Sequence, residues 1–411
     1  MKFLICGINY APDLVGISKY TSELAVWLAS ERNEVRVVTS PPYYPVWKKQ
    51  VVGDGLFFRR EKRDGVIVFR CPIYVPAVPT GPKRLIHLLS FALTSLPVML
   101  WSAIFYRPDV VISIAPALFS APGARLAAYF SGAKSWLHIQ DFEIDAAFEL
   151  GLLKGGFFRR FAVSCERLLL RSFHKVSSIS PQMVRLLVDK GNPSERTYEL
   201  RNWVDLDLVH PLDGNDEYRH DLGLSPSDVV VLYSGNIGSK QGLEILVDVA
   251  QKSATRSDIK FLIAGDGPGK TVLVEAFEGL TNVFFLPLQP LGRLNLLLNA
   301  ADIHILPQRA GAADLVLPSK LTGMMASGRP VVATAEVGTG IDVELEGCGI
   351  VVPPGNADAL AQAIFELSVD PERRRILGAA ARSHAVKTFG MDVVLENFLL
   401  HCREMVQSSN N

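Results

Sequence analysis

The chain alternates short, β-rich apolar runs with stretches of helical periodicity. KFLICGI (2–8) is a continuous apolar run of the kind that buried parallel strands show. It is followed by ISKYTSELAVWLASE (17–31), whose apolar residues recur on one helical face. Further β-rich runs, with helical stretches between them, lie at 34–40, 65–76, 108–116, 135–141 and 175–181. This β–α alternation predicts an α/β fold with a doubly wound parallel sheet.

The alternation pauses once and then starts again. Residues 210–228 are polar, with Pro, Gly and Asp, and we interpret them as a linker. A second series of β-rich runs begins with VVVLYSG (229–235). A chain of 411 residues is also long for one domain. We therefore predict two Rossmann-like domains, 1–205 and 206–390, that face each other across a ligand cleft, with a last helix in 391–411 that packs back on the first domain.

Composition and charge exclude several classes of protein. Lys plus Arg and Asp plus Glu both number 42, so no basic field favours nucleic acid as a partner. The five cysteines are scattered without a CxxC or a Cys/His cluster, which indicates neither a zinc site nor a disulfide framework. The start, MKFLICGINYAPD (1–13), has too short an apolar run for a signal peptide. These features predict a cytoplasmic protein.

One apolar segment is long enough to raise the question of a membrane. Residues 85–106 contain no Asp, Glu, Lys or Arg, and a bilayer span needs about 20 such residues. Basic residues flank both ends, so they specify no orientation. We expect a helix that is broken near Pro97. Three interpretations stay open for this helix: a core helix of the first domain, a helix at a membrane surface, and a transmembrane span.

Two nucleotide-binding classes are excluded by their motifs. A dinucleotide fold carries GxGxxG after its first strand and an acid at the end of its second strand. Here the first run leads into GINYAPDLVG (7–16), and the second ends in VVTSP (37–41), so both features are missing. The sequence has no GxxxxGK[ST] either, which excludes a P-loop NTPase.

Three turns in the second half of the chain are typical of phosphate binding. SGNIGSKQG (234–242) and PSK (318–320) place Lys240 and Lys320 beside predicted helix starts, and AGDGPG (264–269) follows a predicted strand. Glycines let backbone amides approach a phosphate, and a lysine supplies a point charge. A lysine in a first helical turn without an acid is unfavourable unless an anion lies near it. We predict that Lys240 and Lys320 bind a diphosphate.

Long strings across the whole chain carry a family resemblance. They are GINYAPDLVGISKYTSELAVWLA (7–29), PPYYPVW (41–47), LHIQDFEIDAA (137–147), YSGNIGSKQGLE (233–244) and AADLVLPSKLTGMMASGRPVV (312–332). On these strings the sequence resembles the retaining glycosyltransferases of family 4, in their exopolysaccharide and colanic acid branch. The resemblance implies the two-domain GT-B fold. It also implies sugar transfer from a nucleotide diphosphate donor without a bound metal or a cofactor.

The resemblance assigns residues that would hold the donor. The family's two glutamates fall on Asp314, which keeps a carboxylate for the donor sugar, and on Thr322, which has no charge to offer the ribose. The other donor-binding positions that the resemblance and the phosphate motifs imply in these regions are Gly16, Gly265, Leu315, Val316, Ser319 and Lys320.

The phosphate loop departs from the family pattern at two positions. The usual arginine falls on Asn236 and the usual lysine on Gln241, so Lys240 is left as the working cation. Arg309 is interpreted either as a replacement for the missing arginine or as a solvated loop charge.

The first half of the chain holds catalytic and acceptor candidates. His138 and Asp141 end a predicted strand where the family places a histidine or an aspartate against the donor sugar, and a structural histidine is the alternative for His138. Tyr43 and Tyr44 suit stacking on an acceptor sugar, contact with lipid, or plain packing. Glu143 suits acceptor hydroxyls or solvent. With Asp314, His138 and Asp141 complete the predicted catalytic set, and no metal ligands are predicted.

The predicted function is a retaining glycosyltransferase that uses a UDP- or GDP-linked sugar, such as the 6-deoxyhexose fucose. The expected acceptor is a polyprenyl-diphosphate-linked glycan in exopolysaccharide, capsule or O-antigen synthesis. The expected location is the cytoplasmic face of the inner membrane, contacted through 85–106 and the basic, apolar segment 157–175. The alternatives are a soluble acceptor, a sugar-nucleotide epimerase of GT-B fold, and an inactive binding module.

Overall fold

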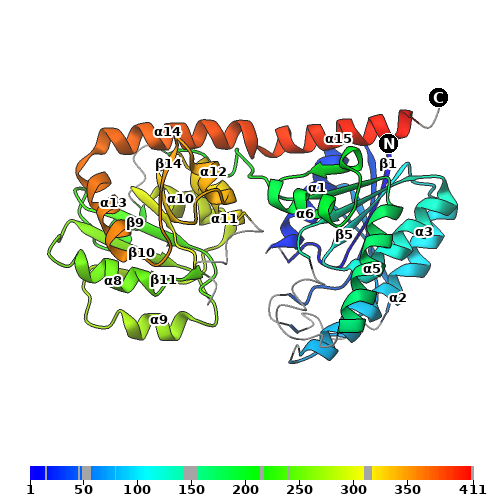
Figure 1. Cartoon of the computed structure of the whole chain (residues 1–411), viewed down its shortest axis with the longest axis horizontal. Coiled ribbons are helices and arrows are strands. Elements are labelled where there is room, and N and C mark those ends of the chain that lie inside the picture. The colour runs from blue at the N-terminus through cyan, green and yellow to red at the C-terminus, as the bar shows by residue number, and fades with distance from the viewer. Residues whose placement is uncertain are drawn as a thin grey trace. The chain divides into compact units, whose positions relative to one another are not determined.

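A computed structural model of the chain forms two compact units (Figure 1). Unit 1 comprises Met1–Arg201 with Leu395–Asn411, and unit 2 comprises Asn202–Val394. The structure describes residues 1–13, 16–44, 47–48, 57–78, 80–142, 156–212, 217–238, 241–309 and 317–408.

Unit 1 is built on an eight-stranded sheet in the order β3-β4-β2-β1-β5-β6-β7-β8. Its strands are β1 (Lys2–Gly7), β2 (Glu34–Thr39), β3 (Arg59–Arg63), β4 (Val66–Arg70), β5 (Val110–Ala115), β6 (Lys134–Ile139), β7 (Lys175–Ser178) and β8 (Thr197–Glu199). All pairs are parallel except β3 with β4. The chain runs outward from β1 in both directions, as in doubly wound sheets. Every residue of β5 is buried, which explains its uninterrupted apolar sequence.

Helices connect the strands of unit 1. They are α1 (Ile17–Ser30), α2 (Gly81–Phe105), α3 (Ala121–Ser131), α5 (Gly156–Ser172) and α6 (Pro181–Asp189), with short 3-10 turns η1 (Leu118–Ser120) and η2 (Ser194–Arg196). The last helix, α15 (Met391–Gln407), contributes its C-terminal part to this unit. There the ring of Phe398 lies 4.6 Å from that of Trp136, centroid to centroid.

Unit 2 has a fully parallel six-stranded sheet in the order β11-β10-β9-β12-β13-β14. The strands are β9 (Val229–Ser234), β10 (Ile259–Ala264), β11 (Val283–Leu286), β12 (Ile303–Leu306), β13 (Val331–Thr334) and β14 (Gly349–Val352). Numbered from β9, this is the 3-2-1-4-5-6 order of the Rossmann fold. The helices are α7 (Glu217–Asp221), α8 (Ile245–Lys252), α9 (Lys270–Ala276), α10 (Leu294–Asn299), α11 (Ser319–Ala326), α12 (Gly340–Leu345), α13 (Ala357–Val369) and α14 (Pro371–Thr388), with the 3-10 turn η4 (Leu291–Arg293).

Two expectations about local structure were wrong. The segment 210–228 is no free linker, because it includes α7, whose Tyr218 is buried in a core cluster of unit 2. The helix expected to break near Pro97 runs unbroken through it. Pro97 lies on an exposed part of α2, where the carbonyl left without a helical N–H donor has access to water.

α2 buries only one stripe of its surface, which includes His87, Phe91 and Met99. Within the described part of the chain, α2 is the one helix that is long and apolar enough to cross a membrane. Of its most apolar 18-residue stretch, 28% is buried. A helix so little buried is not simply a core helix of unit 1, although its buried stripe does pack against the domain.

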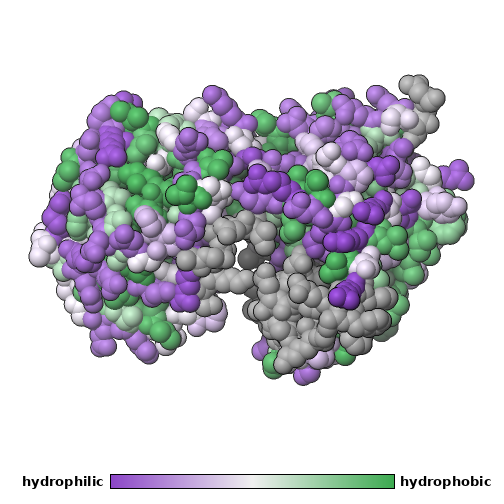
Figure 2. Space-filling model, in the orientation of Figure 1, coloured by the Kyte–Doolittle hydropathy of each residue, from purple (hydrophilic) through white to green (hydrophobic). Residues whose placement is uncertain are grey.

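An apolar surface, named here the α2–α3 face, extends over α2, η1 and α3. Its exposed large side chains are Leu85, Ile86, Leu89, Leu93, Trp101, Ile104, Phe105, Phe119, Leu126, Tyr129 and Phe130. In Figure 2 hydrophobic surface covers the part of unit 1 where Figure 1 places α3. Monomeric soluble proteins rarely expose large contiguous apolar patches unless the patch binds something.

Arg70, the last residue of β4, bonds the loops that follow the neighbouring strands β1 and β2 of unit 1. Its side chain is buried at the end of β4, and Nη1 donates to the Ser40 carbonyl at 2.9 Å. Nη2 donates to the Ala11 carbonyl and to Glu61 of β3. Ala11 lies beyond β1 and Ser40 directly follows β2, so one guanidinium fixes the carboxyl edge of this part of the sheet.

We expect Arg70→Gln to lower the free energy of unfolding by about 2–4 kcal/mol, because it leaves buried carbonyls without their charged donor. Urea unfolding of the full chain measures this change. Arg63→Gln, on the neighbouring β3, is the control. Its side chain is 42% exposed and pairs with exposed Asp64, so the expected change is within about 0.5 kcal/mol. Equal stabilities of the two variants would contradict this role of Arg70.

Candidate donor site at the carboxyl edge of unit 2

The chain order of unit 2 reverses between β9 and β12, and doubly wound sheets bind ligands beyond the carboxyl ends of strands at such a point. Gly235 and Asn236 follow β9 directly, and Arg309 follows β12. The helix that begins after the next loop is α11, which carries Ser319, Lys320 and Thr322 in its first half.

Lys320 lies against an aromatic side chain of β9. Its Nζ donates a hydrogen bond to the Tyr233 hydroxyl at 2.8 Å and lies 4.2 Å from the centroid of the Tyr233 ring. The Tyr233 hydroxyl in turn donates to the Asn236 carbonyl at 2.6 Å. A Cβ added to Gly235 would lie 3.5 Å from Lys320 Nζ, so the lysine passes directly beside the glycine turn. β9, the turn at Gly235 and α11 therefore meet at the Lys320 ammonium.

Burial lowers the pKa of Lys320 to about 7. Part of the side chain still contacts solvent. The ammonium has no carboxylate partner within the described part of the chain, and its hydroxyl and ring contacts do not replace full hydration. Burial also raises the pKa of the Tyr233 hydroxyl, which therefore stays a neutral partner. An anion placed beside Lys320 would restore its charged form.

The N-terminus of α11 is open to a ligand. Pro318 occupies the N-cap position without a side-chain cap, and no acid lies in the first turn. Ser319 is exposed. The first amides of a helix and its dipole favour an anion, as does Lys320. Thr322, in contrast, is buried, and its hydroxyl donates to the Ser319 carbonyl at 2.9 Å, so the hydroxyl is bonded within its own helix.

Glycines allow the turn after β10 to pack closely against the turn after β9. A Cβ on Gly265 would lie 1.9 Å from the Gly235 carbonyl oxygen, and one on Gly267 would lie 2.4 Å from that of Ile237. The turns also exchange backbone hydrogen bonds, from Gly235 to the Ala264 carbonyl and from Ile237 to the Asp266 carbonyl. Gly265 therefore supports the loop after β9. The backbone of Gly235 occupies the space where a side chain of residue 265 would lie.

Arg309 is already paired. Its Nε and Nη2 donate to Glu244 at 2.8 and 2.7 Å, and both side chains are more than half exposed. The backbone of Arg309 lies close to Gly242, which has a φ of 64°. A phosphate that binds Arg309 would have to compete with Glu244. Asn236 is exposed.

Five predicted site residues lie outside the described residues: Lys240, Asp314, Leu315, Val316 and Glu143. Their assignments stay predictions.

In unit 1, His138 is buried at the carboxyl end of β6. Ser177 Oγ accepts from Trp136 Nε1 at 2.7 Å and lies 2.9 Å from His138 Nδ1. The Ser177 hydroxyl can donate to Nδ1 or accept from it, and the direction depends on the imidazole tautomer. Burial lowers the pKa of His138 to about 3. His138 is therefore a neutral imidazole and a poor base near neutral pH, and Asp141 lies exposed just beyond it.

The acceptor candidates Tyr43 and Tyr44 are held by Asp13, a residue that the sequence analysis missed. Its buried Oδ2 accepts the backbone N–H groups of Tyr43 and Tyr44 at 3.2 and 3.3 Å. The Tyr43 side chain is buried against Trp47 and His87, with ring centroids 5.5 and 4.7 Å away, whereas Tyr44 is exposed. Of the two tyrosines, Tyr44 is the one whose ring is accessible to a sugar.

Gly16 stands at the N-cap position of α1 with a φ of 61°, a conformation that favours glycine. No atom of a described residue lies within 4 Å of a Cβ added to Gly16. Both the helix-start interpretation and an approach of ligand to this backbone fit its position.

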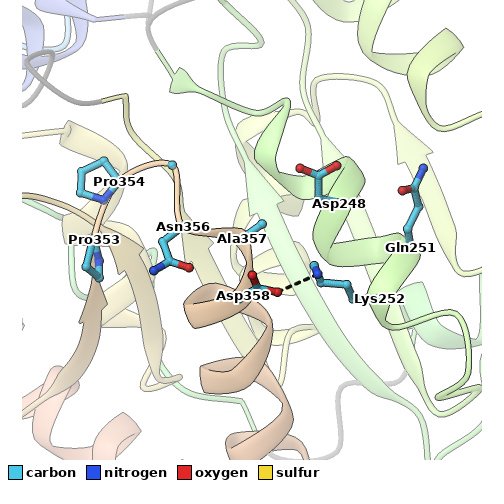
Figure 3. Close-up of a pocket in the computed structure, with 9 residues that line it drawn as sticks. Asp248, Gln251, Lys252, Pro353, Pro354, Asn356, Ala357 and Asp358 are labelled. Carbon is cyan, nitrogen blue, oxygen red and sulfur yellow. Dashed lines mark ion pairs between the residues drawn. The ribbon is translucent and has the colours of Figure 1, made fainter.

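A separate hollow of about 700 Å³ lies between the end of α8 and the start of α13 (Figure 3). Lys252 and Asp358 form an ion pair of 2.6 Å across it, and Pro353, Pro354 and Asn356 form its other side. None of the predicted site residues lines this hollow. Its lysine is neutralised by Asp358, unlike Lys320.

Comparisons with known proteins agree with the two-unit architecture. Residues 15–203 match the family model of the glycosyl transferase 4-like domain, and residues 214–384 match that of glycosyl transferases group 1. The putative colanic acid biosynthesis glycosyl transferase WcaI of Escherichia coli (strain K12) is 41% identical over 412 residues, which cover 97% of this chain and 99% of the relative. The chain therefore belongs to this family of glycosyltransferases and is a transferase.

Solved structures share the fold over the whole chain. Sucrose-phosphate synthase from Thermosynechococcus elongatus has a TM-score of 0.76 at 18% identity and covers 99% of both chains. Anabaena Alr3699/HepE, in complex with UDP and glucose, has a TM-score of 0.69 at 17% identity and covers 98% of this chain and 100% of its own. At such identities the likeness concerns the fold alone, which is the predicted GT-B fold.

We expect Gly265→Ala to destabilise the protein by about 3 kcal/mol or more, because the new Cβ meets a backbone carbonyl of the neighbouring turn. Gly292→Ala is the matched control, since no described residue has an atom within 4 Å of a Cβ added there. Thermal unfolding of both variants measures the difference. Unfolding midpoints equal to wild type for both would refute the packing role of Gly265.

Proposed function

We propose that the protein transfers a sugar from a nucleoside diphosphate sugar to a lipid-linked glycan in exopolysaccharide synthesis, such as that of colanic acid. The observation that carries the donor assignment is the partly desolvated Lys320 ammonium at the start of the uncapped helix α11. The relative named for colanic acid biosynthesis supports the pathway. The donor is proposed to be UDP- or GDP-linked, with a 6-deoxyhexose such as fucose as the sugar.

The chemistry of transfer explains the need for positive charge at this edge. When the glycosidic bond to the donor breaks, negative charge grows on the departing diphosphate. Fixed cations and helix amides stabilise that transition state more than the ground state. We propose that Lys320 and the first amides of α11 supply this charge without a metal, and that the reaction retains the anomeric configuration. His138 and Asp141 would contact the donor sugar from unit 1.

Incubation of purified protein with UDP-, GDP- and ADP-sugars, with and without a polyprenyl-diphosphate-linked glycan, tests this function. Acceptor-dependent transfer with retained configuration is the expected result. Turnover without acceptor would instead indicate an epimerase or hydrolase. Tight donor binding without any turnover would indicate an inactive binding module. Transfer only to a water-soluble acceptor would contradict the lipid-linked assignment.

We expect Lys320→Ala to weaken UDP binding about 10- to 100-fold with little effect on folding, since a hydrogen bond to a charged group contributes about 1.5–3 kcal/mol. Isothermal titration measures the affinity. Lys252→Ala is the matched control, because Lys252 is exposed, paired with Asp358 and lies in the other hollow. An unchanged affinity in Lys320→Ala would refute the phosphate assignment.

The pH dependence of UDP binding follows from the lowered pKa of Lys320, about 7 in the free protein. A bound diphosphate favours the ammonium and raises that pKa, so binding takes up a proton above pH 7. We expect the affinity to fall by up to about tenfold per unit between pH 7.5 and 9, where the phosphates of UDP are fully ionised. Lys320→Ala should remove this dependence. A flat profile for the wild type would contradict the assignment.

We further propose that unit 1 docks on the inner membrane through the α2–α3 face. Lys83, Arg84 and Arg107 are exposed at the two ends of α2, and Arg160 and Arg167 are exposed on α5. Apolar side chains with basic residues near them bind an anionic lipid surface by burial and by charge together. Docking there would bring the enzyme to a lipid-linked acceptor.

We expect the double variant Leu93→Glu/Phe105→Glu to lose most binding to vesicles of anionic lipid at low salt, because each side chain is 71% exposed on α2. Vesicle flotation measures binding. Val337→Glu, at a 93% exposed apolar residue of unit 2, is the control and should bind as wild type does. Wild-type protein that stays wholly unbound, or equal binding by all three proteins, would overturn this docking surface.

A further inference from the structure

A second hollow, lined by several arginines, lies at the opposite edge of the unit 2 sheet from Lys320. It has a volume of about 560 Å³ and is formed by α14 and by the residues that lead into β12 and β13. Its lining residues are Pro211, Asp302, Gly328, Arg329, Pro330, Pro371, Arg374, Arg375, Ala379, Arg382 and Ser383, and it is called the arginine hollow below. Asp302 and Pro330 precede strands, so this is the amino edge of the sheet.

Among the described residues, two of its arginines donate to carbonyl oxygens alone. Arg374 Nη1 donates to the Ser368 carbonyl at 2.9 Å and to that of Leu367. Arg382 Nη1 donates to the Val209 and Ala326 carbonyls at 2.9 and 2.8 Å. Within the described ranges no carboxylate pairs with either guanidinium. Each guanidinium has five N–H donors, so most of them stay available to a ligand.

The acid in the lining does not cancel this charge. Asp302 accepts from Arg219 and from the backbone N–H of Val230, so its carboxylate is already bonded within the fold. Arg375 pairs with Glu372 at 2.6 Å on the exposed side of α14. The hollow thus keeps an excess of positive charge at Arg374 and Arg382.

The walls of the hollow are fixed by a close backbone contact. A Cβ on Gly378 of α14 would lie 2.1 Å from the Gly328 carbonyl oxygen, so only glycine lets the helix approach this turn. Arg374 and Arg382 stand four residues before and after Gly378, on the same side of α14. Their positions around the hollow are therefore set before any ligand arrives.

We propose that the arginine hollow binds a soluble, phosphate-bearing small anion at a site separate from the donor site. Guanidinium groups bind phosphate oxygens in pairs, and ligand pockets commonly measure about 300–1,000 Å³. The lining has no large apolar side chain, which favours a soluble anion over the headgroup of a membrane lipid. This site would let the concentration of such an anion act on unit 2 from the edge opposite to the transfer reaction.

Arg374 and Arg382 also bond carbonyls at the ends of α13 and α11, so removing them would disturb the fold as well as the hollow. Ala379 avoids this difficulty, because it lines the hollow, is exposed and lies on a helix. Ala379→Glu adds a carboxylate beside the arginines and removes no hydrogen bond. Ala379→Gln has nearly the same shape without the charge.

The test is isothermal titration of the full chain with inorganic pyrophosphate at constant ionic strength, in a Lys320→Ala background that weakens the donor site. We expect binding to persist in this background and in Lys320→Ala/Ala379→Gln, and to weaken at least tenfold in Lys320→Ala/Ala379→Glu. Thermal unfolding without ligand checks that the variants fold equally well.

Three outcomes would overturn the proposal. The first is loss of all pyrophosphate binding in Lys320→Ala alone, which would place every phosphate at the donor edge. The second is equal affinity in the Glu and Gln variants. The third is binding to vesicles containing phosphatidic acid that Ala379→Glu abolishes, while pyrophosphate does not bind, which would make the ligand a lipid.

Discussion

The Lys320 ammonium, packed against the Tyr233 ring without a counter-charge among the described residues, is the constraint on which the candidate site depends. Taking a charge out of water is unfavourable unless an opposite charge or several hydrogen bonds replace the water. Here one phenol hydroxyl and one aromatic face do so only in part, and the pKa of the lysine falls to about 7. A bound diphosphate would supply the missing charge. Burial of Lys320 thus favours occupancy of the site by an anion.

Strand order brings the other parts of the site to this lysine. β9 lies at the centre of the unit 2 sheet and supplies both Tyr233 and the turn at Gly235, while β12, its neighbour, leads towards α11. The turn after β10 supports the turn after β9 by direct backbone contact at Gly265. Unit 1 uses the same edge of its own sheet, where Asp13 and Arg70 fix the loops that carry Tyr43 and Tyr44. In both units, buried polar side chains bond the backbone of the loops at this edge: Tyr233 in unit 2, and Asp13 and Arg70 in unit 1.

Sequence reasoning found the strands that are buried on both faces, because an uninterrupted apolar run such as that of β5 is typical of a strand covered by helices on either side. It missed β3, whose sequence RREKR is fully exposed and is held by backbone pairing with β4 at the edge of the sheet. A charged edge strand protects a sheet from further pairing but leaves no apolar pattern to recognise. The polarity of 210–228 was misleading for a related reason. Its ion pair between Arg219 and Asp302 joins positions far apart in the sequence.

The same limit applies to the site. The lysine at the start of α11 was recognisable, because it opposes the helix dipole in a turn without acids. Tyr233 was missed as its partner, although a single tyrosine in the aliphatic run VVVLYS was a usable signal for a polar contact at the strand end. Thr322 stands where the family has the glutamate that holds the ribose, and its hydroxyl is bonded inside α11. Which side chains share a hydrogen bond depends on the register between elements, which local patterns do not contain.

A crystal structure of the protein with a bound nucleoside diphosphate tests the central claim most directly. We expect the terminal phosphate to lie within hydrogen-bond distance of Lys320 Nζ and of the first amides of α11. A diphosphate bound elsewhere, with Lys320 still bonded only to Tyr233, would contradict it.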